Sequence, residues 1–344
     1  MPLILLILKI YIKILISKVY KLIMKILVIQ NRMGIRDTVI FLPFIEAISE
    51  KFKVPVSLLV QQNSKSDQYL NETDYIDEII ILQKNNKIKN LRHNGFIGSL
   101  KLALDLKKYK FDKVFIFNSS LRFNIIARTS GIKDINQFPL FKKRGQDMIQ
   151  ASYDLIYNNL GIKVLKDPSI QVSNKRVSEA ASKFNISQNN LNILLGIGGS
   201  GPSKRIPAKT YLKIMEKISK KKNCKFFLAT GLSIDEQNIL NEIKNSAFKN
   251  NCISLDKFSI NQCLPIIKNC HVSICNDTSF SHLSSALGIK TITLMADTPL
   301  IYGSYSSKMH PIIPDGETTV SHNTLGKDKI NPDKIYKKLL SIID

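Results

Sequence analysis

Three segments of this sequence carry residue types that could bind an anion or move a proton. The first covers residues 31–43, N-R-M-G-I-R-D-T-V-I-F-L-P, and holds Asp37 between a strand-like run and an apolar, helix-compatible run. An aspartate at a helix start accepts backbone N–H bonds as a cap. It could equally take a proton from a substrate hydroxyl as a general base. The position alone leaves both interpretations open.

The second segment covers residues 196–207, G-I-G-G-S-G-P-S-K-R-I-P. Its glycines let the backbone come close to a ligand, and Lys204 with Arg205 would bring positive charge to a diphosphate. The pattern is neither the P-loop G-x-x-x-x-G-K-[ST] nor a complete G-x-G-x-x-G. We interpret it as a phosphate-facing loop, and a flexible surface turn is the alternative.

The third segment covers residues 275–288, C-N-D-T-S-F-S-H-L-S-S-A-L-G. The pattern predicts a helix that opens at Asp277, Thr278 and Ser279 and closes at Gly288. Free N–H groups and hydroxyls at a helix start favour an anion, and His282 lies one turn further on the same side. A simple cap with a histidine at the edge of the core is the alternative.

The elements that would position these segments alternate along the chain. Short β-branched runs precede helix-compatible stretches, as in residues 26–29 before 38–51 and residues 192–196 before 207–222. This pattern is typical of parallel strands covered on both faces in an α/β fold. Ligands of such sheets bind outside the carboxyl ends of the strands. We therefore expect two Rossmann-like domains with a cleft between them.

Composition narrows the class of protein and of partner. The formal charge of +23 on 344 residues reflects either a general lysine bias or attraction to a membrane surface or a phosphorylated substrate. The absence of tryptophan and of a basic stripe interleaved with aromatics disfavours nucleic acid. Five cysteines without a C-x-x-C pair predict core thiols in a reducing cytoplasm.

Residues 1–23 are almost all aliphatic apart from Lys9, Lys13, Lys18 and Lys21. The favoured interpretation is a helix lying on the membrane, with lysines reaching anionic headgroups. A spanning helix is the second interpretation, although each central lysine would cost about 2.5–3.5 kcal/mol to insert. The third is an extension without function, because Met24 could itself begin the domain.

Taken together, four motifs resemble glycosyltransferase family 9, the ADP-heptose:lipopolysaccharide heptosyltransferases and their relatives. They are K-I-L-V-I, G-I-x-D-T-V-x-x-x-P, G-x-S-K-R-x-P and N-D-T-x-x-x-H-L-x-x-A-L-G, and the similarity runs over about residues 24–343. The resemblance implies a GT-B fold. It also implies inverting transfer of a sugar from a nucleotide-activated donor, with no cofactor and no essential metal.

The resemblance also implies roles for single residues. Asp37 matches the family's proposed base, Lys204 its phosphate-binding lysine, and Asp277 the acidic residue that contacts the donor sugar. The diphosphate-binding helix start matches Thr278, Ser279 and His282. We add Ser200 to the donor-binding residues, and Gly34 with Arg36 to the acceptor side.

Some positions depart from the family pattern. Arg36 and Ser279 stand where the family commonly has glycine, and Ile206 stands where an aromatic residue is frequent. The turn that often reads F-G-P-T is here M-A-D-T, residues 295–298. These changes bear on the identity of the donor and on activity.

The sequence thus predicts four parts. Residues 1–23 form a membrane-associating helix or extension, 24–165 an acceptor-side domain, 166–330 a sugar-nucleotide domain, and 331–344 a helix that packs back toward the first domain. The expected partners are an ADP-linked sugar donor, an anionic glycolipid or core-oligosaccharide acceptor and the membrane surface. We expect a peripheral protein at the inner face of the cytoplasmic membrane, where Lys142, Lys143 and Arg144 either favour that surface or form a solvated loop.

The predicted function is transfer of a heptose from ADP-heptose to a lipopolysaccharide core or another lipid-linked glycan. Two alternatives stay open from the sequence. One is a non-catalytic protein that binds sugar nucleotides, with Arg36 marking a lost active site. The other is a sugar-nucleotide epimerase of the same fold, which would need no acceptor.

Overall fold

The computed structural model describes residues 24–84, 91–140, 147–199 and 201–343. The chain divides into two compact units. Described residues up to 67 and residues 73–166 form the first, and residues 68–72 and 167 onward form the second. The expected helix over residues 1–23, the basic residues 142–144 and Ser200 lie outside the described residues. In the described ranges, no helix is both long enough and apolar enough to cross a membrane.

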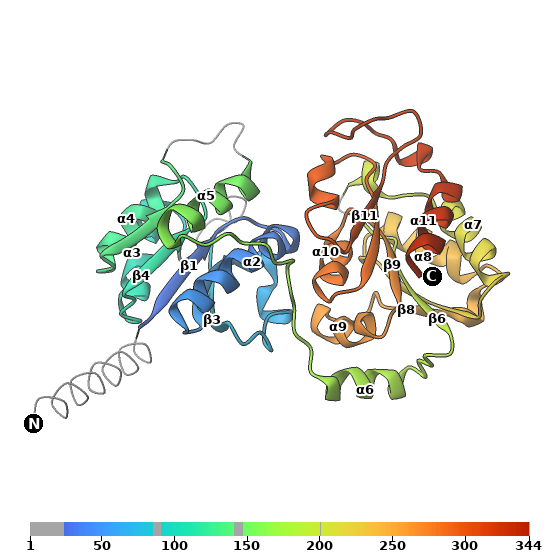
Figure 1. Ribbon diagram of the computed structural model, residues 1–344, viewed down its shortest axis with the longest axis horizontal. Coiled ribbons are helices and arrows are strands. Elements are labelled where there is room, and N and C mark those ends of the chain that lie inside the picture. The colour runs from blue at the N-terminus through green and yellow to red at the C-terminus, as the bar shows by residue number, and fades with distance from the viewer. Residues whose placement is uncertain (1–23, 85–90, 141–146, 200, 344) are drawn as a thin grey trace, which may run out of the picture. The chain divides into compact units, whose positions relative to one another are not determined.

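The first unit is built on a five-stranded parallel sheet in the order β3-β2-β1-β4-β5 (Figure 1). Val28 at its centre lies opposite Leu58 and Phe115. Every residue of β1 is buried, as expected for a parallel strand that is covered on both faces. The strands are β1 (Ile26–Gln30), β2 (Val56–Gln61), β3 (Ile76–Leu82), β4 (Lys113–Ile116) and β5 (Asp134–Gln137).

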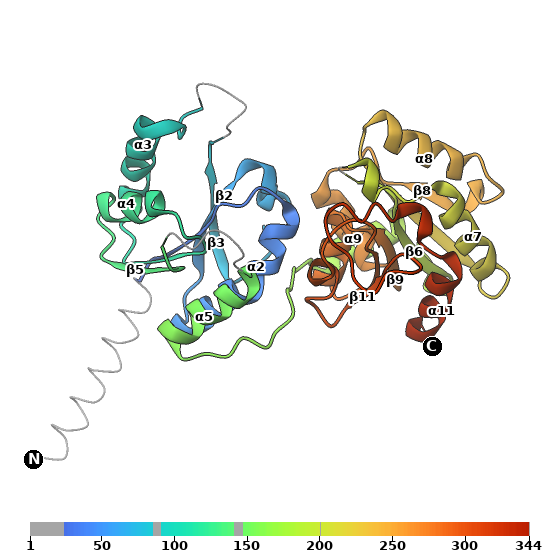
Figure 2. The same ribbon diagram turned by 90° about the horizontal axis from the view of Figure 1, so that it is seen from above.

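Among the described residues, four helices cover this sheet. The helices α2 (Ile35–Phe52) and α5 (Met148–Leu160) pack together on one face, and α3 (Gly95–Lys107) and α4 (Leu121–Thr129) pack together on the other (Figure 2). Short 3-10 turns at Gln62–Ser64 and Ser66–Gln68 follow β2. The start of α5 is capped by the Asp147 side chain, which accepts from the N–H groups of Ile149 and Gln150.

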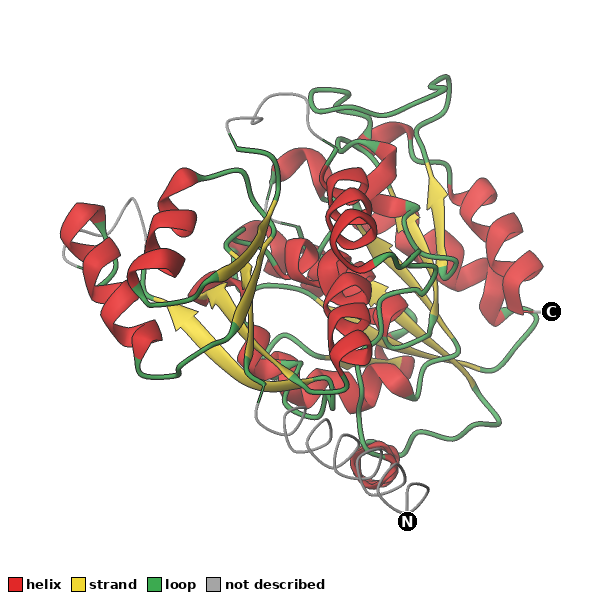
Figure 3. Ribbon diagram, turned by 60° about the vertical axis from the view of Figure 1, so that its left-hand side comes forward, coloured by secondary structure: helices red, strands yellow, loops and turns green. Residues whose placement is uncertain are grey.

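The second unit has a six-stranded parallel sheet in the order β11-β10-β9-β6-β7-β8, with helices on both sides of the strands (Figure 3). The strands are β6 (Leu191–Gly196), β7 (Cys224–Ala229), β8 (Cys252–Ser254), β9 (Val272–Asn276), β10 (Lys290–Leu294) and β11 (Met309–Ile312). The helices are α6 (Asn174–Lys183), α7 (Ala208–Ser219), α8 (Ile234–Lys244), α9 (Ile260–Lys268), α10 (Ser279–Ala286) and α11 (Pro332–Ile343). The 3-10 turns are Pro202–Lys204, Lys249–Asn251, Leu300–Gly303 and Lys327–Lys329.

The last helix packs inside the second unit. α11 lies on α7 and β10, and the expectation that residues 331–344 pack back toward the first domain stays a prediction. Ile335, Leu339 and Ile342 are buried there in the core shared with α7. The reason is that the apolar stripe of α11 completes the cover of the second sheet.

A short piece of the first half of the sequence belongs to the second unit. The guanidinium of Arg176 at the start of α6 is paired with Glu72, and the N–H of Ile260 donates to the Gln68 side chain over 3.2 Å. The sequence did not predict this exchange, because residues 68–72 carry no linker-like composition. The main boundary falls after Lys166, one residue beyond the predicted one.

Candidate functional site

The predicted phosphate-facing loop and the start of α10 follow neighbouring strands, because β6 pairs with β9. Asn276, the last residue of β9, is fully buried and fixes the loop. Its side-chain N–H groups donate to the carbonyl oxygens of Ile197 and Gly198, each over 2.9 Å. Its side-chain oxygen accepts from the Tyr211 hydroxyl over 2.7 Å. These bonds hold the glycine-rich loop at the carboxyl edge of the second sheet.

At this edge the structure brings together Lys204, Asp277 and His282. The Lys204 ammonium donates to Asp277 Oδ2 over 3.0 Å, and His282 Nε2 lies 3.4 Å from Asp277 Oδ1. The other ring nitrogen of His282 is hydrogen-bonded to the Tyr305 hydroxyl over 2.8 Å, with the two rings stacked. Asp277 and His282 are buried, and Lys204 is partly exposed. The partly exposed Lys204 ammonium is therefore the outermost group of a row of polar groups that continues inward through the buried Asp277 and His282.

The start of α10 lies directly after Asp277. Thr278 is the N-cap and Ser279 the first helical residue, so their backbone N–H groups are among those that a helix leaves unpaired. The Thr278 hydroxyl oxygen is buried and makes no hydrogen bond within the described part of the chain. A helix start of this kind favours an anion. By contrast, Arg205, which we expected to face a diphosphate, is paired with Asp235 at 2.9 Å.

Sequence reasoning missed Glu236 in the first turn of α8. Its carboxylate accepts from the N–H groups of Gly199 and Gly231 over 2.9 and 3.3 Å and from the Ser233 hydroxyl over 2.6 Å. Burial raises the pKa of Glu236, but these hydrogen bonds outweigh burial and leave the pKa below its usual value. The available signal was the run G-L-S-I-D-E after β7, which places a glycine and an acid at a third strand end.

In the first unit, Asp37 is the third residue of α2 and caps that helix. Its carboxylate accepts from the Gly34 N–H over 3.2 Å. The same carboxylate lies 3.4 Å from Arg32 Nε and 3.9 Å from Arg36 Nε. Its side chain is 15% exposed and is therefore in partial contact with solvent. Capping is therefore established by geometry, and the role of Asp37 as a base stays a prediction.

The model of glycosyltransferase family 9 (heptosyltransferase) matches residues 100–316, which is more than half of the chain. This chain belongs to glycosyltransferase family 9. The family resemblance predicted from the four motifs is thereby confirmed, and the chain is a glycosyltransferase. Lipopolysaccharide heptosyltransferase 1 of Campylobacter coli is 23% identical over 334 residues, which cover 88% of this chain and 93% of that relative.

Solved structures of family 9 members share the fold. ADP-heptose lps heptosyltransferase II of E. coli has a TM-score of 0.70 at 19% identity and covers 93% of this chain and 98% of its own. The family 9 glycosyl transferase of Veillonella parvula has a TM-score of 0.75 at 16% identity, with 93% and 97% covered. The prediction of a GT-B architecture with two Rossmann-like units is confirmed by these matches.

This family 9 chain also has a cationic cluster that we did not predict. Lys84 follows β3 and Arg122 is the second residue of α4. Burial lowers the pKa of both, and repulsion from Arg122 lowers that of Lys84 further. Arg122 donates to the His93 carbonyl over 2.6 Å, but its Nε and the side-chain nitrogen of Asn118 are buried without a hydrogen bond among the described residues. The cluster thus offers unused N–H donors at the carboxyl edge of the first sheet.

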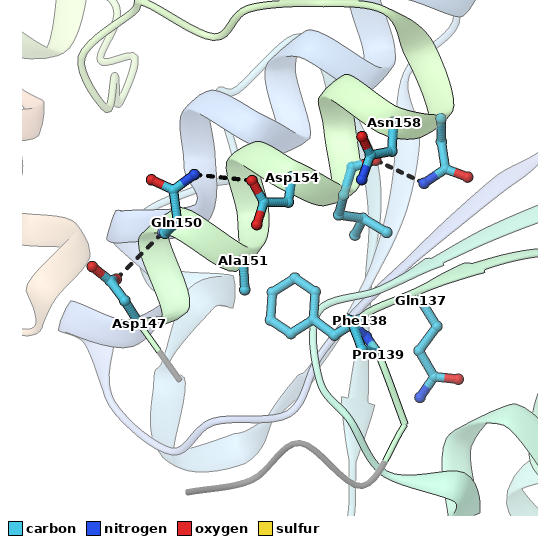
Figure 4. A pocket seen from close by; sticks show the side chains of 10 residues that line it. Gln137, Phe138, Pro139, Asp147, Gln150, Ala151, Asp154 and Asn158 are labelled. Carbon is cyan, nitrogen blue, oxygen red and sulfur yellow. Dashed lines mark hydrogen bonds between the residues drawn. The ribbon is translucent and has the colours of Figure 1, made fainter. Parts of the chain in front are cut away.

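The first unit of the family 9 chain also has a pocket of about 320 Å³ between α5 and the end of β5. Figure 4 shows the Phe138 ring there, with Gln150 bonded to Asp154 above it. Gln137 donates to the Asn118 carbonyl over 3.0 Å and so joins the pocket to the end of β4. The pocket is lined by Gln137, Phe138, Pro139, Asp147, Gln150, Ala151, Asp154, Leu155, Asn158 and Asn159. Walls of amides and carboxylates suit hydroxyl groups better than an anion.

Gly196 shows how tightly the carboxyl edge of the second sheet is packed in this glycosyltransferase. It lies opposite Cys275, and a Cβ at position 196 would come within 2.6 Å of the Cys275 sulfur and 2.8 Å of its Cβ. We expect Gly196→Ala to lower the free energy of unfolding by about 1–3 kcal/mol because the buried neighbours must shift. Urea denaturation measures this change.

Gly201→Ala is the matched control, because a Cβ there would meet nothing closer than Ser203 Oγ at 4.0 Å. We expect its unfolding midpoint to stay near that of the wild type. Equal losses in the two variants would contradict the close packing of β6 on β9.

Proposed function

We propose that this glycosyltransferase moves a heptose from ADP-heptose to a lipopolysaccharide core or another lipid-linked glycan, with inversion of configuration. The observation that carries the proposal is the assembly of Lys204, Asp277 and His282 at the start of α10. The names of the relatives agree with it, since they include a lipopolysaccharide heptosyltransferase and an ADP-heptose lps heptosyltransferase. Action at the inner face of the cytoplasmic membrane, without an essential metal, is part of the proposal.

The donor-side residues would act on the leaving group. Breaking the bond to the sugar leaves negative charge on the nucleoside diphosphate, and stabilising that charge is the main electrostatic task of the reaction. The Lys204 ammonium, His282 and the N–H groups at Thr278 and Ser279 supply donors for it. Asp277 holds Lys204 at 3.0 Å and would contact the donor sugar.

The acceptor hydroxyl must lose its proton as it attacks the sugar. Asp37 is the proposed general base. Its carboxylate is partly exposed to solvent, and the hydrogen bond from the Gly34 N–H fixes the orientation of the side chain. The guanidinium groups of Arg32 and Arg36 lie within 3.9 Å of the same carboxylate. We propose that they also attract an anionic acceptor toward it.

The cluster of Lys84 and Arg122 supports an anionic acceptor. A phosphate or carboxylate of the acceptor would give these half-buried cations the counter-charge that no described side chain gives them. We expect Arg122→Gln to raise the acceptor KM about tenfold or more, because one charge-assisted hydrogen bond is lost. Acceptor titrations at saturating donor measure this change.

Arg128→Gln is the control for that variant. Arg128 lies on the same helix, is exposed and bonds to the Asn124 side chain over 2.9 Å. With the acceptor glycan freed from its lipid, so that membrane binding plays no part, we expect the acceptor KM of Arg128→Gln, and the donor Kd of both variants, to equal the wild-type values. A lower or unchanged acceptor KM in Arg122→Gln would contradict an anion site at this position.

The proposed function itself is tested by nucleotide release. Wild-type protein is incubated with ADP-heptose and a membrane-lipid extract, and ADP and the glycolipid product are measured. Release that depends on the acceptor supports the transferase. A changed sugar nucleotide formed without acceptor would instead establish an epimerase. Binding without any release, across a panel of sugar nucleotides, would establish a non-catalytic protein.

A further inference from the structure

The outward face of α3 is apolar. Phe96 is 80% exposed and Ile97 68% exposed, and Leu100 and Leu104 are exposed as well. Phe96, Leu100 and Leu104 are spaced by four residues and therefore form one row along the helix. The opposite face, with Leu102, Ala103 and Leu106, already fills the core of the first unit. The exposed row is therefore not needed to hold α3 on the sheet.

The neighbouring helix extends this surface. Leu121 and Ile125 of α4 are exposed, and α3 packs beside α4 (Figure 2). Six large apolar side chains thus gather on two adjacent helices, and we call them the α3–α4 face. Contiguous exposed apolar patches mark interaction surfaces, whereas scattered exposed leucines do not. The α3–α4 face comprises Phe96, Ile97, Leu100, Leu104, Leu121 and Ile125.

The charges around the α3–α4 face are positive. Lys101, Lys107 and Lys108 of α3 and its C-cap are exposed, as is Arg128 of α4. The single acid of α3, Asp105, is held by Arg92 through two bonds of 2.7 Å, which keep its pKa far below the usual value. An apolar face with a rim of lysines is the pattern of interfacial helices, where lysines reach anionic headgroups.

We propose that the α3–α4 face docks on an anionic lipid bilayer. The charge of the rim favours such a partner by roughly 1 kcal/mol per lysine or arginine near the surface. Both helices begin at the carboxyl edge of the first sheet, so Phe96 and Leu121 lie at the same edge as Arg122. A bilayer on this face would therefore present the glycan of a lipid-linked acceptor close to the cationic cluster. The inference goes beyond glycosyl transfer and does not depend on the identity of the donor.

An environment-sensitive fluorophore on Leu100→Cys tests this contact in the full-length chain. Selective labelling is feasible because four of the five native cysteines are buried, and burial raises the pKa of the remaining one, Cys252, to about 11. Leu232→Cys is the matched control, since Leu232 is 74% exposed in the second unit. Each labelled protein is titrated with phosphatidylglycerol-containing vesicles and with phosphatidylcholine vesicles.

We expect a blue shift and a gain in intensity for the label at position 100 with the anionic vesicles, and neither change for the label at position 232. High salt should weaken the response, because the headgroup attraction is screened. A chain that sediments with vesicles while the label at 100 stays water-exposed would place the contact elsewhere and overturn the proposal. So would a spectral change that appears on concentrating the protein without vesicles, which indicates a second copy on this face.

Substitution provides an independent arm. We expect Phe96→Ser/Leu100→Ser/Leu104→Ser to lower the partition onto anionic vesicles about tenfold or more, while Leu232→Ser/Ile234→Ser leaves it unchanged. Equal partition of the two variants would overturn the proposal. No sugar nucleotide is used in either arm, so a negative result would leave the proposed transfer reaction to its own test.

Discussion

Asp37→Asn is expected to lower kcat for glycosyl transfer by about 100- to 10,000-fold, the usual contribution of a general base. The amide cannot accept a proton from the attacking hydroxyl at neutral pH. Its oxygen can still accept from the Gly34 N–H, which lies 3.2 Å from the carboxylate in the wild type. The cap of α2 is therefore retained, and we expect the unfolding free energy to fall by less than about 1 kcal/mol. ADP release at saturating donor and acceptor measures kcat.

The donor Kd of the Asp37→Asn protein should equal the wild-type value, because Asp37 belongs to the first unit and the proposed donor-binding residues belong to the second. Asp134→Asn is the control for loss of an aspartate from an ion pair, since Asp134 is paired with Lys113 at an exposed position. It should leave kcat unchanged. Full activity of Asp37→Asn would reduce Asp37 to a helix cap and remove the base from the proposal.

Lys204→Met is expected to lower both the free energy of unfolding and the affinity for the donor nucleotide. The substitution removes the ammonium that lies 3.0 Å from Asp277, whose side chain is 2% exposed. Removing the cation beside a buried carboxylate costs about 3 kcal/mol of unfolding free energy. The same ammonium is proposed to bind the diphosphate, so ADP affinity should fall about 100-fold, or about 2.7 kcal/mol. Urea denaturation and calorimetric titration with ADP measure the two effects.

The double variant Lys204→Met/Asp277→Asn separates these effects. It also removes the negative charge of Asp277, which the single variant leaves without its nearest cation, so the unfolding free energy should return to within about 1 kcal/mol of the wild type. ADP affinity should stay low, because the cation is still missing. Recovery of ADP affinity together with stability would show that Lys204 acts only by holding Asp277.

The features that could be predicted are those that depend on residues close together in the sequence. Buried parallel strands such as β1 and β9 appear as short β-branched runs because both of their faces are covered. Asp277, Thr278 and His282 follow one strand within six residues, so their common location could be predicted from spacing. The same reasoning placed Lys204 on the loop after another strand, and the structure pairs that strand with β9 and joins Lys204 to Asp277.

The missed residues owe their position to contacts between distant segments. Lys84 and Arg122 come from different strand ends, and each looks like an ordinary surface cation in the sequence. Glu236 looks like the usual acid in a first helical turn, and its role depends on N–H groups from two separate loops. The packing of α11 on α7 and β10 was not predicted, because a terminal amphipathic stripe does not indicate which core it covers.

The order of strands in the second sheet has a consequence for synthesis on the ribosome. β6 lies at the centre of that sheet, but its partner β9 comes about 80 residues later in the chain, with Ile193 opposite Val272. At roughly 5–20 residues per second, about 4–16 s pass before that partner is made. During this time one edge of the apolar strand β6 keeps unpaired backbone N–H and C=O groups, which can pair with another chain. We therefore expect aggregation and chaperone binding to be greatest for nascent chains that contain β6 but not yet β9.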